Sequence, residues 1–183
     1  HDNKKIREFN IIDAYNIIEL ILRINENCEI AIISDQCIYA DFDITHFWPE
    51  EKYYYIKDFN EIKKNNINVN KIIIKQQSID EISKYIKSFS AEIYIQKIEE
   101  DIALILHKNA TKYNAIKFLA NIYDYNLVDI ICFGNDYNDI EMIKNCGKGI
   151  VVNNALKEIK EYADDVCDNN NSEGVAKWLS RLL

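Results

Sequence analysis

Strand-like and helix-like patterns alternate at short spacing along the second half of the chain. Residues 111–123 carry apolar side chains at helical spacing, residues 129–133 contain a short apolar run, and residues 139–145 return to a helical pattern that ends before Gly147. A short apolar run between helical segments is typical of a buried strand in a parallel sheet. The alternation therefore predicts βαβ units and an α/β fold for this half. Later elements are expected as a strand at 149–152, a helix at 155–162, a small strand near 166–167 and a helix at 172–182.

The first half of the chain has a different organisation. A helical pattern over residues 11–23 precedes two β-rich runs, 29–34 and 37–40, which Asp35 and Gln36 separate as in a hairpin. Further elements are expected as a strand or aromatic lip at Tyr53–Tyr55, a strand at 71–75, a helix from an N-cap at Ser78 to about Phe89, and strands at 92–96 and 102–106. This mixture predicts an α+β domain over residues 1–107, followed by the α/β domain over residues 108–183.

The composition indicates a soluble globular protein. Of the 183 residues, 48% are hydrophobic and 28% are charged, which is too apolar for a disordered chain. The formal net charge of -8 argues against broad binding to nucleic acid or to an anionic membrane. Five cysteines lack the paired spacing of a zinc site, so we expect reduced thiols in a cytoplasmic protein. Because the chain begins with His1 and has no leader pattern, we expect a piece of a longer protein.

A polar segment directly follows the first strand expected in the second half. Gly134 lets the backbone turn after the strand, and Asn135, Asp136, Asn138 and Asp139 come next. Open α/β sheets place ligand sites where a parallel strand passes into a helix. Carboxylate and carboxamide oxygens there suit a hard cation such as Mg²⁺, which commonly shares its ligands with a substrate phosphate. The alternative is an acidic helix N-terminus whose charges interact favourably with the helix dipole.

Several motifs of the second half resemble those of the haloacid dehalogenase-like phosphatases, specifically the Cof-type subfamily with a large inserted cap. The fourth family motif, GDxxND followed by a sequence such as IEM, corresponds to residues 134–142. The third, a lysine after a small hydroxyl residue at a helix start, corresponds to Thr111 and Lys112. Downstream family segments correspond to residues 149–155, 163–164 and 173–176. Residues 1–106 resemble the inserted cap only in the order of their strands and helices.

This resemblance implies a fold and a chemistry. The fold is an α/β, Rossmann-like core, of which residues 108–183 are the C-terminal part, with an inserted α+β cap domain at residues 1–107. In the family, an Asp of the first motif attacks phosphorus to form an aspartyl-phosphate, and Mg²⁺ offsets the charge repulsion. The partner that the resemblance implies is a small phosphorylated metabolite rather than nucleic acid or a membrane.

The resemblance also assigns roles to individual residues. Lys112 is the catalytic residue that neutralises the phosphate and its nucleophile, although outside the family context it reads as an ordinary solvated lysine. Asn138 and Asn154 bind substrate or phosphate. Asn135 and Asp139 hold the metal or its waters.

Two departures from the family pattern bear on activity. Asn135 stands where the motif normally has Asp, which removes a negative charge, so we expect Mg²⁺ binding to be weak or absent in this chain. The first motif, Asp-x-Asp-Gly-Thr after an apolar strand, does not occur before the expected cap. We therefore expect a phosphatase parent and an inactive chain. The alternative is a degenerate, non-catalytic domain that binds a phosphometabolite or a protein partner.

Asp41 and Asp43 imitate the first motif, because they follow an apolar run as Asp-x-Asp and precede Thr45. Ile44 replaces the glycine that the turn needs, and the preceding residues read as a hairpin rather than as a lone parallel strand. We interpret both carboxylates as solvated residues at a strand end.

An incomplete parallel sheet has a physical consequence. Without its first strands, the sheet would leave an unpaired edge and exposed apolar side chains, which we expect at residues 130–131 and 116–120. We therefore expect self-association through the incomplete core, or disorder over residues 108–183.

Overall fold

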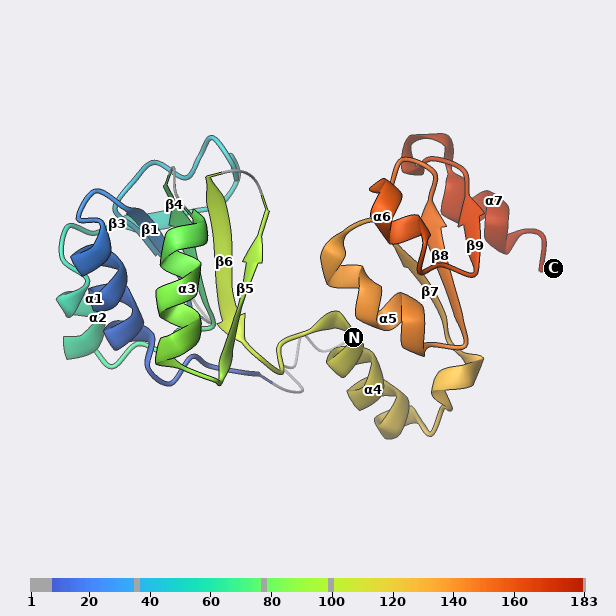
Figure 1. Ribbon diagram of the computed structural model, residues 1–183, viewed down its shortest axis with the longest axis horizontal. Coiled ribbons are helices and arrows are strands. Elements are labelled where there is room, and N and C mark those ends of the chain that lie inside the picture. Colours follow the sequence, from blue (N-terminus) through green and yellow to red (C-terminus); the bar gives the residue numbers. More distant parts are fainter. Residues whose placement is uncertain (1–7, 35–36, 77–78, 99–100, 183) are drawn as a thin grey trace. The chain divides into compact units, whose positions relative to one another are not determined.

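The chain divides into two compact units, His1–Ala110 and Thr111–Leu183 (Figure 1). The computed structural model describes residues 8–34, 37–76, 79–98 and 101–182. The division lies slightly beyond the boundary expected near residue 108. Each unit has its own sheet and its own buried core, so each is considered by itself.

Unit 1 is built on a six-stranded sheet with the order β3-β2-β1-β4-β6-β5. Its strands are β1 (Glu29–Ile33), β2 (Ile38–Ala40), β3 (Tyr53–Tyr55), β4 (Lys71–Lys75), β5 (Ile93–Lys97) and β6 (Ile102–His107). All neighbouring pairs are antiparallel except β2 and β3, which are parallel. The expected hairpin is present as β1 and β2, with Ile32 opposite Tyr39. Its turn residues, Asp35 and Gln36, lie outside the described residues.

Three helices cover one face of this sheet: α1 (Ala14–Ile24), α2 (Asn60–Lys64) and α3 (Ile79–Phe89) (Figure 1). In α1, Ala14, Ile17, Ile18 and Ile21 recur at helical spacing and are all buried. They pack against alternate strand residues that face the helices, including Ile30, Ile32, Ile72, Ile74 and Ile105. Alternation along the strands therefore builds one face of the core, and helical periodicity builds the other.

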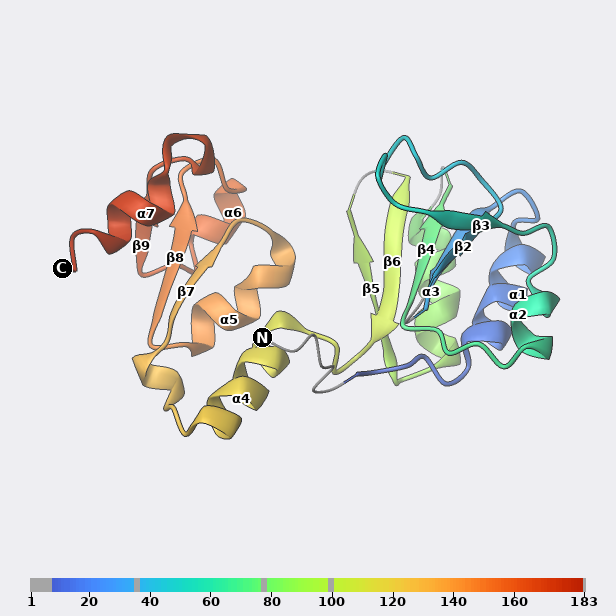
Figure 2. The same cartoon turned by 180° about the vertical axis from the view of Figure 1, so that it is seen from behind.

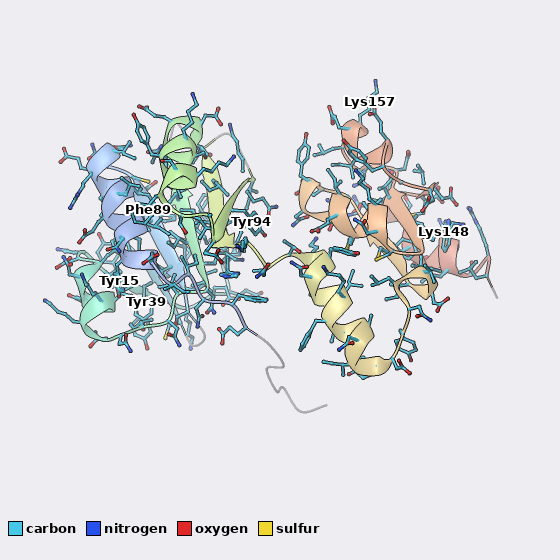
Figure 3. The ribbon with its side chains drawn as sticks, turned by 60° about the horizontal axis from the view of Figure 1, so that its bottom comes forward. Tyr15, Tyr39, Phe89, Tyr94, Lys148 and Lys157 are labelled. Atoms are coloured by element: carbon cyan, nitrogen blue, oxygen red, sulfur yellow. The ribbon has the colours of Figure 1, made fainter. Side chains whose placement is uncertain are left out.

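The opposite face of the sheet carries a smaller apolar cluster. Figure 2 shows the molecule from this side, with the strands of unit 1 in front of α3. Ala31 and Ile73 of the strands pack there with Phe42 and Ile44, which follow β2. The hydroxyl of Tyr94, labelled in Figure 3, donates to the carbonyl of Ala110 at 3.1 Å. This bond ties the last residue of unit 1 to its edge strand β5.

Unit 2 contains a three-stranded parallel sheet with the order β7-β8-β9, as the alternating pattern predicted. The strands are β7 (Ile131–Gly134), β8 (Lys148–Val152) and β9 (Asp165–Cys167), and the helices are α4 (Lys112–Tyr123), α5 (Ile140–Asn145), α6 (Lys157–Lys160) and α7 (Gly174–Leu179). Three 3₁₀ turns, η1 (Leu127–Asp129), η2 (Tyr137–Asp139) and η3 (Asn170–Ser172), complete it. Ile150 and Trp178 lie in one buried cluster, and Lys148 (Figure 3) lies over the Trp178 ring, 5.0 Å from its centroid.

Several expected boundaries differ from the structure. The strand expected at 129–133 begins only at Ile131, because residues 127–129 form the turn η1. The helix expected at 155–162 is limited to Lys157–Lys160, where only Ile159 is buried. Helix α2 was not predicted, because a helix of 5 residues with one buried side chain leaves no readable periodicity. The expected N-cap of α3, Ser78, lies outside the described residues.

Unit 2 has an open sheet edge and an apolar surface beside it. Among the described residues, β7 pairs only with β8. Leu119, Ile122, Val128 and Ile131 are exposed, whereas Ala120 is buried. The prediction of exposed apolar side chains is thus confirmed at Ile131 and Leu119, and it is wrong for Ala120. Regular elements run through this unit, so self-association rather than disorder remains our expectation. No helix in the described ranges combines the length and apolarity that a membrane crossing requires.

Candidate functional site

The polar segment predicted from the sequence lies at the carboxyl end of β7, where the chain passes through η2 into α5. Gly134 ends the strand and faces the start of α5. A Cβ atom placed on Gly134 would lie 2.5 Å from Cβ of Asp139 and 2.9 Å from Cδ1 of Ile143. Only glycine therefore allows the strand to approach the following turn this closely.

Asp139 is the structural centre of this segment. Its side chain is only 1% exposed, and its Oδ2 accepts the backbone N–H groups of Asn135 at 2.8 Å and Asp136 at 3.2 Å. The side chain of Asp136 in turn accepts the N–H of Tyr137 at 2.6 Å, so that Asp136 and Asp139 form a capping box. The loop after β7 is thus held by two carboxylates that satisfy its backbone donors.

Lys112 reaches the same carboxylate from α4. Its ammonium lies 2.5 Å from Oδ1 of Asp139, while 51% of the lysine side chain remains exposed. Thr111 begins the helix as its N-cap, because its side chain accepts the N–H of Asn114 at 3.1 Å. The ammonium has three donors, so an anion can approach it from the solvent side while Asp139 holds it from within.

Two amide side chains flank this pair. Asn135, which the family resemblance places at the metal position, is exposed. The Oδ1 of Asn138 is buried and, among the described residues, has no hydrogen-bond partner. A buried acceptor without a donor is costly, so this oxygen is suited to a ligand donor or a cation.

The described residues do not by themselves fit a Mg²⁺ site. They include no group of three or more His, Cys, Asp or Glu side chains that could hold a metal ion. Both oxygens of Asp139 already accept hydrogen bonds, and Oδ1 of Asp136 accepts one from Tyr137. Asn135 and Asn138 offer only neutral amide oxygens, whereas Mg²⁺ prefers carboxylates. The geometry therefore favours Asp139 as the partner of Lys112 and of the loop, rather than as the metal ligand that the resemblance implies.

Asn154 lies after β8, at the same edge of the parallel sheet as the segment after β7. Its Nδ2 donates to Oδ1 of Asn170 at 2.9 Å, and its Oδ1 accepts the N–H of Asn170 at 3.2 Å. The two neighbouring loops also meet where the N–H of Leu156 donates to the carbonyl of Asn135 at 3.4 Å. Asn154 thus joins the loops after β8 and β9, and the second N–H of its exposed amide remains available to a phosphate oxygen.

Asp41 and Asp43 belong to unit 1 and to a different sheet. Oδ1 of Asp41 accepts the N–H of Ile30 at 2.8 Å across the hairpin, and burial raises the pKa of this half-buried carboxyl. Oδ1 of Asp43 accepts the hydroxyl of Thr45 at 2.7 Å and its N–H at 2.9 Å, and these bonds lower the pKa of Asp43. Because β2 is antiparallel to β1, these carboxylates do not follow a strand of a parallel core, which supports their interpretation as strand-end residues. The expectation that both are solvated holds for the exposed Asp43 and is wrong for Asp41, which is half-buried because it accepts a backbone bond across the hairpin.

Sequence reasoning missed two contributions to this site, the double use of Asp139 and the capping box that Asp136 begins. The spacing of Asp136 and Asp139, three residues apart directly before a helix, is the signal that could have indicated the capping box. No local signal pairs Asp139 with Lys112.

Comparisons with known proteins bear on this site. A family model described as haloacid dehalogenase-like hydrolase matches residues 2–179. The phosphoglycolate phosphatase of Sulfurisphaera tokodaii is 33% identical over 141 residues, which are 73% of this chain and 60% of that protein. The 5-amino-6-(5-phospho-D-ribitylamino)uracil phosphatase of Bacillus subtilis is 35% identical over 79 residues, which are 43% of this chain and 28% of that protein. The chain thus spans less than two thirds of the length of either relative.

Solved structures show the same fold at low sequence identity. A haloacid dehalogenase-like hydrolase from Bacteroides thetaiotaomicron matches with a TM-score of 0.79 and 19% identity, over 95% of this chain and 68% of that chain. A haloacid dehalogenase-like hydrolase from B. subtilis matches with a TM-score of 0.77 and 22% identity, over 95% of this chain and 72% of that chain.

Proposed function

The chain belongs to the haloacid dehalogenase-like hydrolase family, and we propose that the full-length protein is a cytoplasmic phosphatase that hydrolyses monophosphate esters of small metabolites. The pairing of Lys112 with Asp139 beside the end of β7 is the observation that carries this proposal. The two relatives are phosphatases of chemically different phosphate esters, which supports a class of substrates rather than one substrate.

In the proposed reaction, Lys112 acts as a fixed positive charge for the phosphoryl group. Asp139 orients its ammonium, and the solvent-facing donors contact phosphate oxygens. Asn138 binds the substrate through its buried Oδ1, which accepts a hydrogen bond from a donor group of the substrate. Asn154 acts from the neighbouring loop, where the N–H of its amide that does not contact Asn170 donates to the phosphate.

The covalent part of the proposal follows the family chemistry. A carboxylate oxygen of an Asp attacks phosphorus, the ester P–O bond breaks, and the alcohol leaves with a proton from a neighbouring Asp. That Asp then takes a proton from water, which attacks the aspartyl-phosphate and releases inorganic phosphate and the free carboxylate. The 183 residues contain no Asp-x-Asp-Gly-Thr sequence. We therefore propose that this chain alone does not turn over substrate.

We also propose that phosphate hydrolysis by the full-length protein depends on Mg²⁺. Asn135 would contribute only a neutral amide oxygen to this cation. Bound Mg²⁺ would offset phosphate charge. Because the described residues do not make a complete site for this cation, the roles given to Lys112, Asn138 and Asp139 do not depend on it.

Unit 1 is proposed to be the inserted cap that selects the substrate. The order of its strands and helices, with three helices on one face of a mostly antiparallel sheet, supports an autonomous α+β domain beside the α/β unit. Exchanging residues 8–110 for those of a relative with a different substrate should transfer the substrate preference.

A steady-state assay with a chromogenic phosphate monoester tests the main proposal on the full-length protein. Lys112→Ala should lower kcat/KM by about 10²–10³-fold, the usual effect of removing one electrostatic contact to the transition state. Lys117→Ala is the matched control. It removes a lysine of the same helix whose ammonium lies 4.8 Å from the centroid of the Tyr113 ring, and it should leave kcat/KM unchanged. Equal rates for wild type and Lys112→Ala would refute the role of this lysine.

The second candidate function is non-catalytic binding of a phosphometabolite or protein partner. The neutral Asn135 and the lack of a metal-binding carboxylate cluster among the described residues favour it. It predicts that the full-length protein binds inorganic phosphate in a calorimetric titration, that Lys112→Ala abolishes this binding, and that no phosphate monoester is hydrolysed. Hydrolysis that depends on Lys112 decides for the phosphatase.

A further inference from the structure

Two cysteines bracket the candidate site in the sequence and meet in the structure. Cys132 lies within β7, and Cys146 follows the last residue of α5. Cys132 is 5% exposed, whereas Cys146 is partly exposed, and both are free thiols. The segment between them contains Asn135, Asn138 and Asp139.

The facing of strand and helix brings the two side chains together. Gly134 faces Ile143, since an added Cβ would lie 2.9 Å from its Cδ1. Cys132 comes two residues before Gly134 and therefore shares its strand face. Cys146 comes three residues after Ile143 as the C-cap of α5, and its N–H still donates to the carbonyl of Met142 as in a helical turn, so it lies on the side of α5 that faces β7. The two thiols are accordingly near enough to interact, and the neighbourhood of Cys146 contributes to the raised pKa of Cys132.

The backbone holds this approach on both sides. The N–H of Cys146 donates to the carbonyl of Met142 at 3.0 Å, which closes the last turn of α5. The N–H of Gly147 donates to Leu127 at 2.8 Å, and the N–H of Lys148 donates to Ile130 at 3.1 Å. The chain leaving α5 is therefore fixed alongside the chain that enters β7.

The two thiols differ in their access to solvent. Burial, together with the hydrogen bond to Cys146 and the nearby charge of Asp139, raises the pKa of Cys132 to about 12. Cys132 thus remains a protonated, shielded thiol at neutral pH, and an oxidant from solvent meets Cys146 first. Once Cys146 has been oxidised, Cys132 is the neighbouring thiol that can react with it.

We propose that Cys132 and Cys146 form an oxidation site, at which a hydroperoxide closes an intramolecular disulfide around the candidate functional segment. With hydrogen peroxide, the Cys146 sulfur takes one oxygen as a sulfenic acid, and the first water leaves. The Cys132 sulfur then attacks the Cys146 sulfur, the S–O bond breaks, and the hydroxyl leaves with the Cys132 proton as a second water. The two thiols lose two hydrogens, and the peroxide is reduced to two waters.

The disulfide has a defined consequence for the loop after β7. It converts residues 132–146 into a covalent ring that includes Asp139, the partner of Lys112. The formation of this bond does not depend on the proposed phosphatase function. Only its use to regulate turnover rests on that function.

Peptide mapping after oxidation tests the proposal on the full chain. After treatment with hydrogen peroxide and alkylation of the remaining thiols, the peptides containing Cys132 and Cys146 should be joined, lighter by two hydrogens, and separated again by dithiothreitol. Cys37→Ser is the matched control, because Cys37 is also partly exposed but lies in unit 1, and it should retain the cross-link.

Two further variants separate a disulfide from damage. Cys146→Ser, at a partly exposed position, should fold normally and form no cross-link. Cys132→Ala should leave Cys146 to proceed to sulfinic acid. A wild-type protein in which Cys146 becomes sulfinic acid without a cross-link, or in which the cross-link joins other cysteines or two chains, overturns the proposal.

Discussion

The ammonium of Lys112 lies 2.5 Å from Oδ1 of Asp139, although the two residues are 27 positions apart in the sequence. The lysine is half exposed and the carboxylate is buried, so the carboxylate fixes one side of the ammonium and leaves the other free. The same carboxylate also holds the backbone of the loop after β7. The structure thus couples the position of a proposed catalytic charge to the stability of the turn beside it.

Replacing Asp139 should therefore destabilise the protein. Asp139→Ala leaves the N–H groups of Asn135 and Asp136 without their acceptor, and we expect the free energy of unfolding to fall by about 1.5–3 kcal/mol, as for hydrogen bonds to a charged group. Urea unfolding measures this change. Asp168→Ala removes an exposed carboxylate 3.9 Å from Lys177 and should stay within about 0.5 kcal/mol of wild type. Equal midpoints for Asp139→Ala and Asp168→Ala would contradict the role of Asp139.

Restoring a carboxylate at residue 135 should strengthen cation binding. Asn135→Asp adds a negative charge at the exposed position that the family resemblance assigns to the metal, so half-maximal activation of the full-length protein should require less Mg²⁺. Asn153→Asp adds the same charge on the exposed surface after β8 and should leave the Mg²⁺ titration unchanged. An identical titration for wild type and Asn135→Asp would remove residue 135 from the metal site.

The hydrogen bond between Trp178 and Asp165 should make unit 2 sensitive to acid. The indole N–H of Trp178 donates to Oδ2 of Asp165 at 2.8 Å, and this bond, with the N–H of Val166 and the charges of Lys148 and Arg181, lowers the pKa of Asp165. Because the folded-state pKa lies below the unfolded-state value, the stabilisation is present above the unfolded-state value, near pH 4, and is lost as the pH falls through the folded-state pKa. The indole proton resonance of Trp178 should shift over that range.

Asp165→Asn provides the comparison for this titration. An Asn side chain can still accept the indole N–H but does not ionise, so the Trp178 resonance should no longer respond to pH over the same range. A titration that persists in Asp165→Asn would assign the effect to another group.

The open edge of unit 2 should promote self-association of this chain. Within the described part of the chain, β7 is paired on one side only, and Val128, which precedes it by three residues, has 76% of its surface exposed. Sedimentation velocity should therefore show a weight-average mass that rises with concentration, and Val128→Lys should reduce this rise. Ile12→Lys, at a residue 83% exposed in unit 1, is the control and should not. A concentration-independent monomer would refute the expectation.

Local sequence patterns predicted most elements near the site. The helical pattern that begins at residue 111, the apolar run that contains β7 and the Gly at its end each act within a few residues, so they can be read without the fold. The parallel pairing of β2 and β3 could not be read in this way, because it depends on how a strand returns to a distant neighbour. Helix α6 is shorter than its local pattern predicted, and its one buried residue, Ile159, packs with Val151 of β8 and Ile143 of α5, which are distant in the sequence.

The sequence by itself determined the α/β alternation of the second half and placed a polar segment at the end of its first strand, because periodicity and turn residues act locally. Only the tertiary structure decided what those polar side chains do. Asp139 turns inward to Lys112 and to the loop backbone, and Asn154 pairs with Asn170, because a polar side chain near the core takes whichever partners packing brings within reach. Those partners lie on other elements, and nothing in the local sequence specifies their distance.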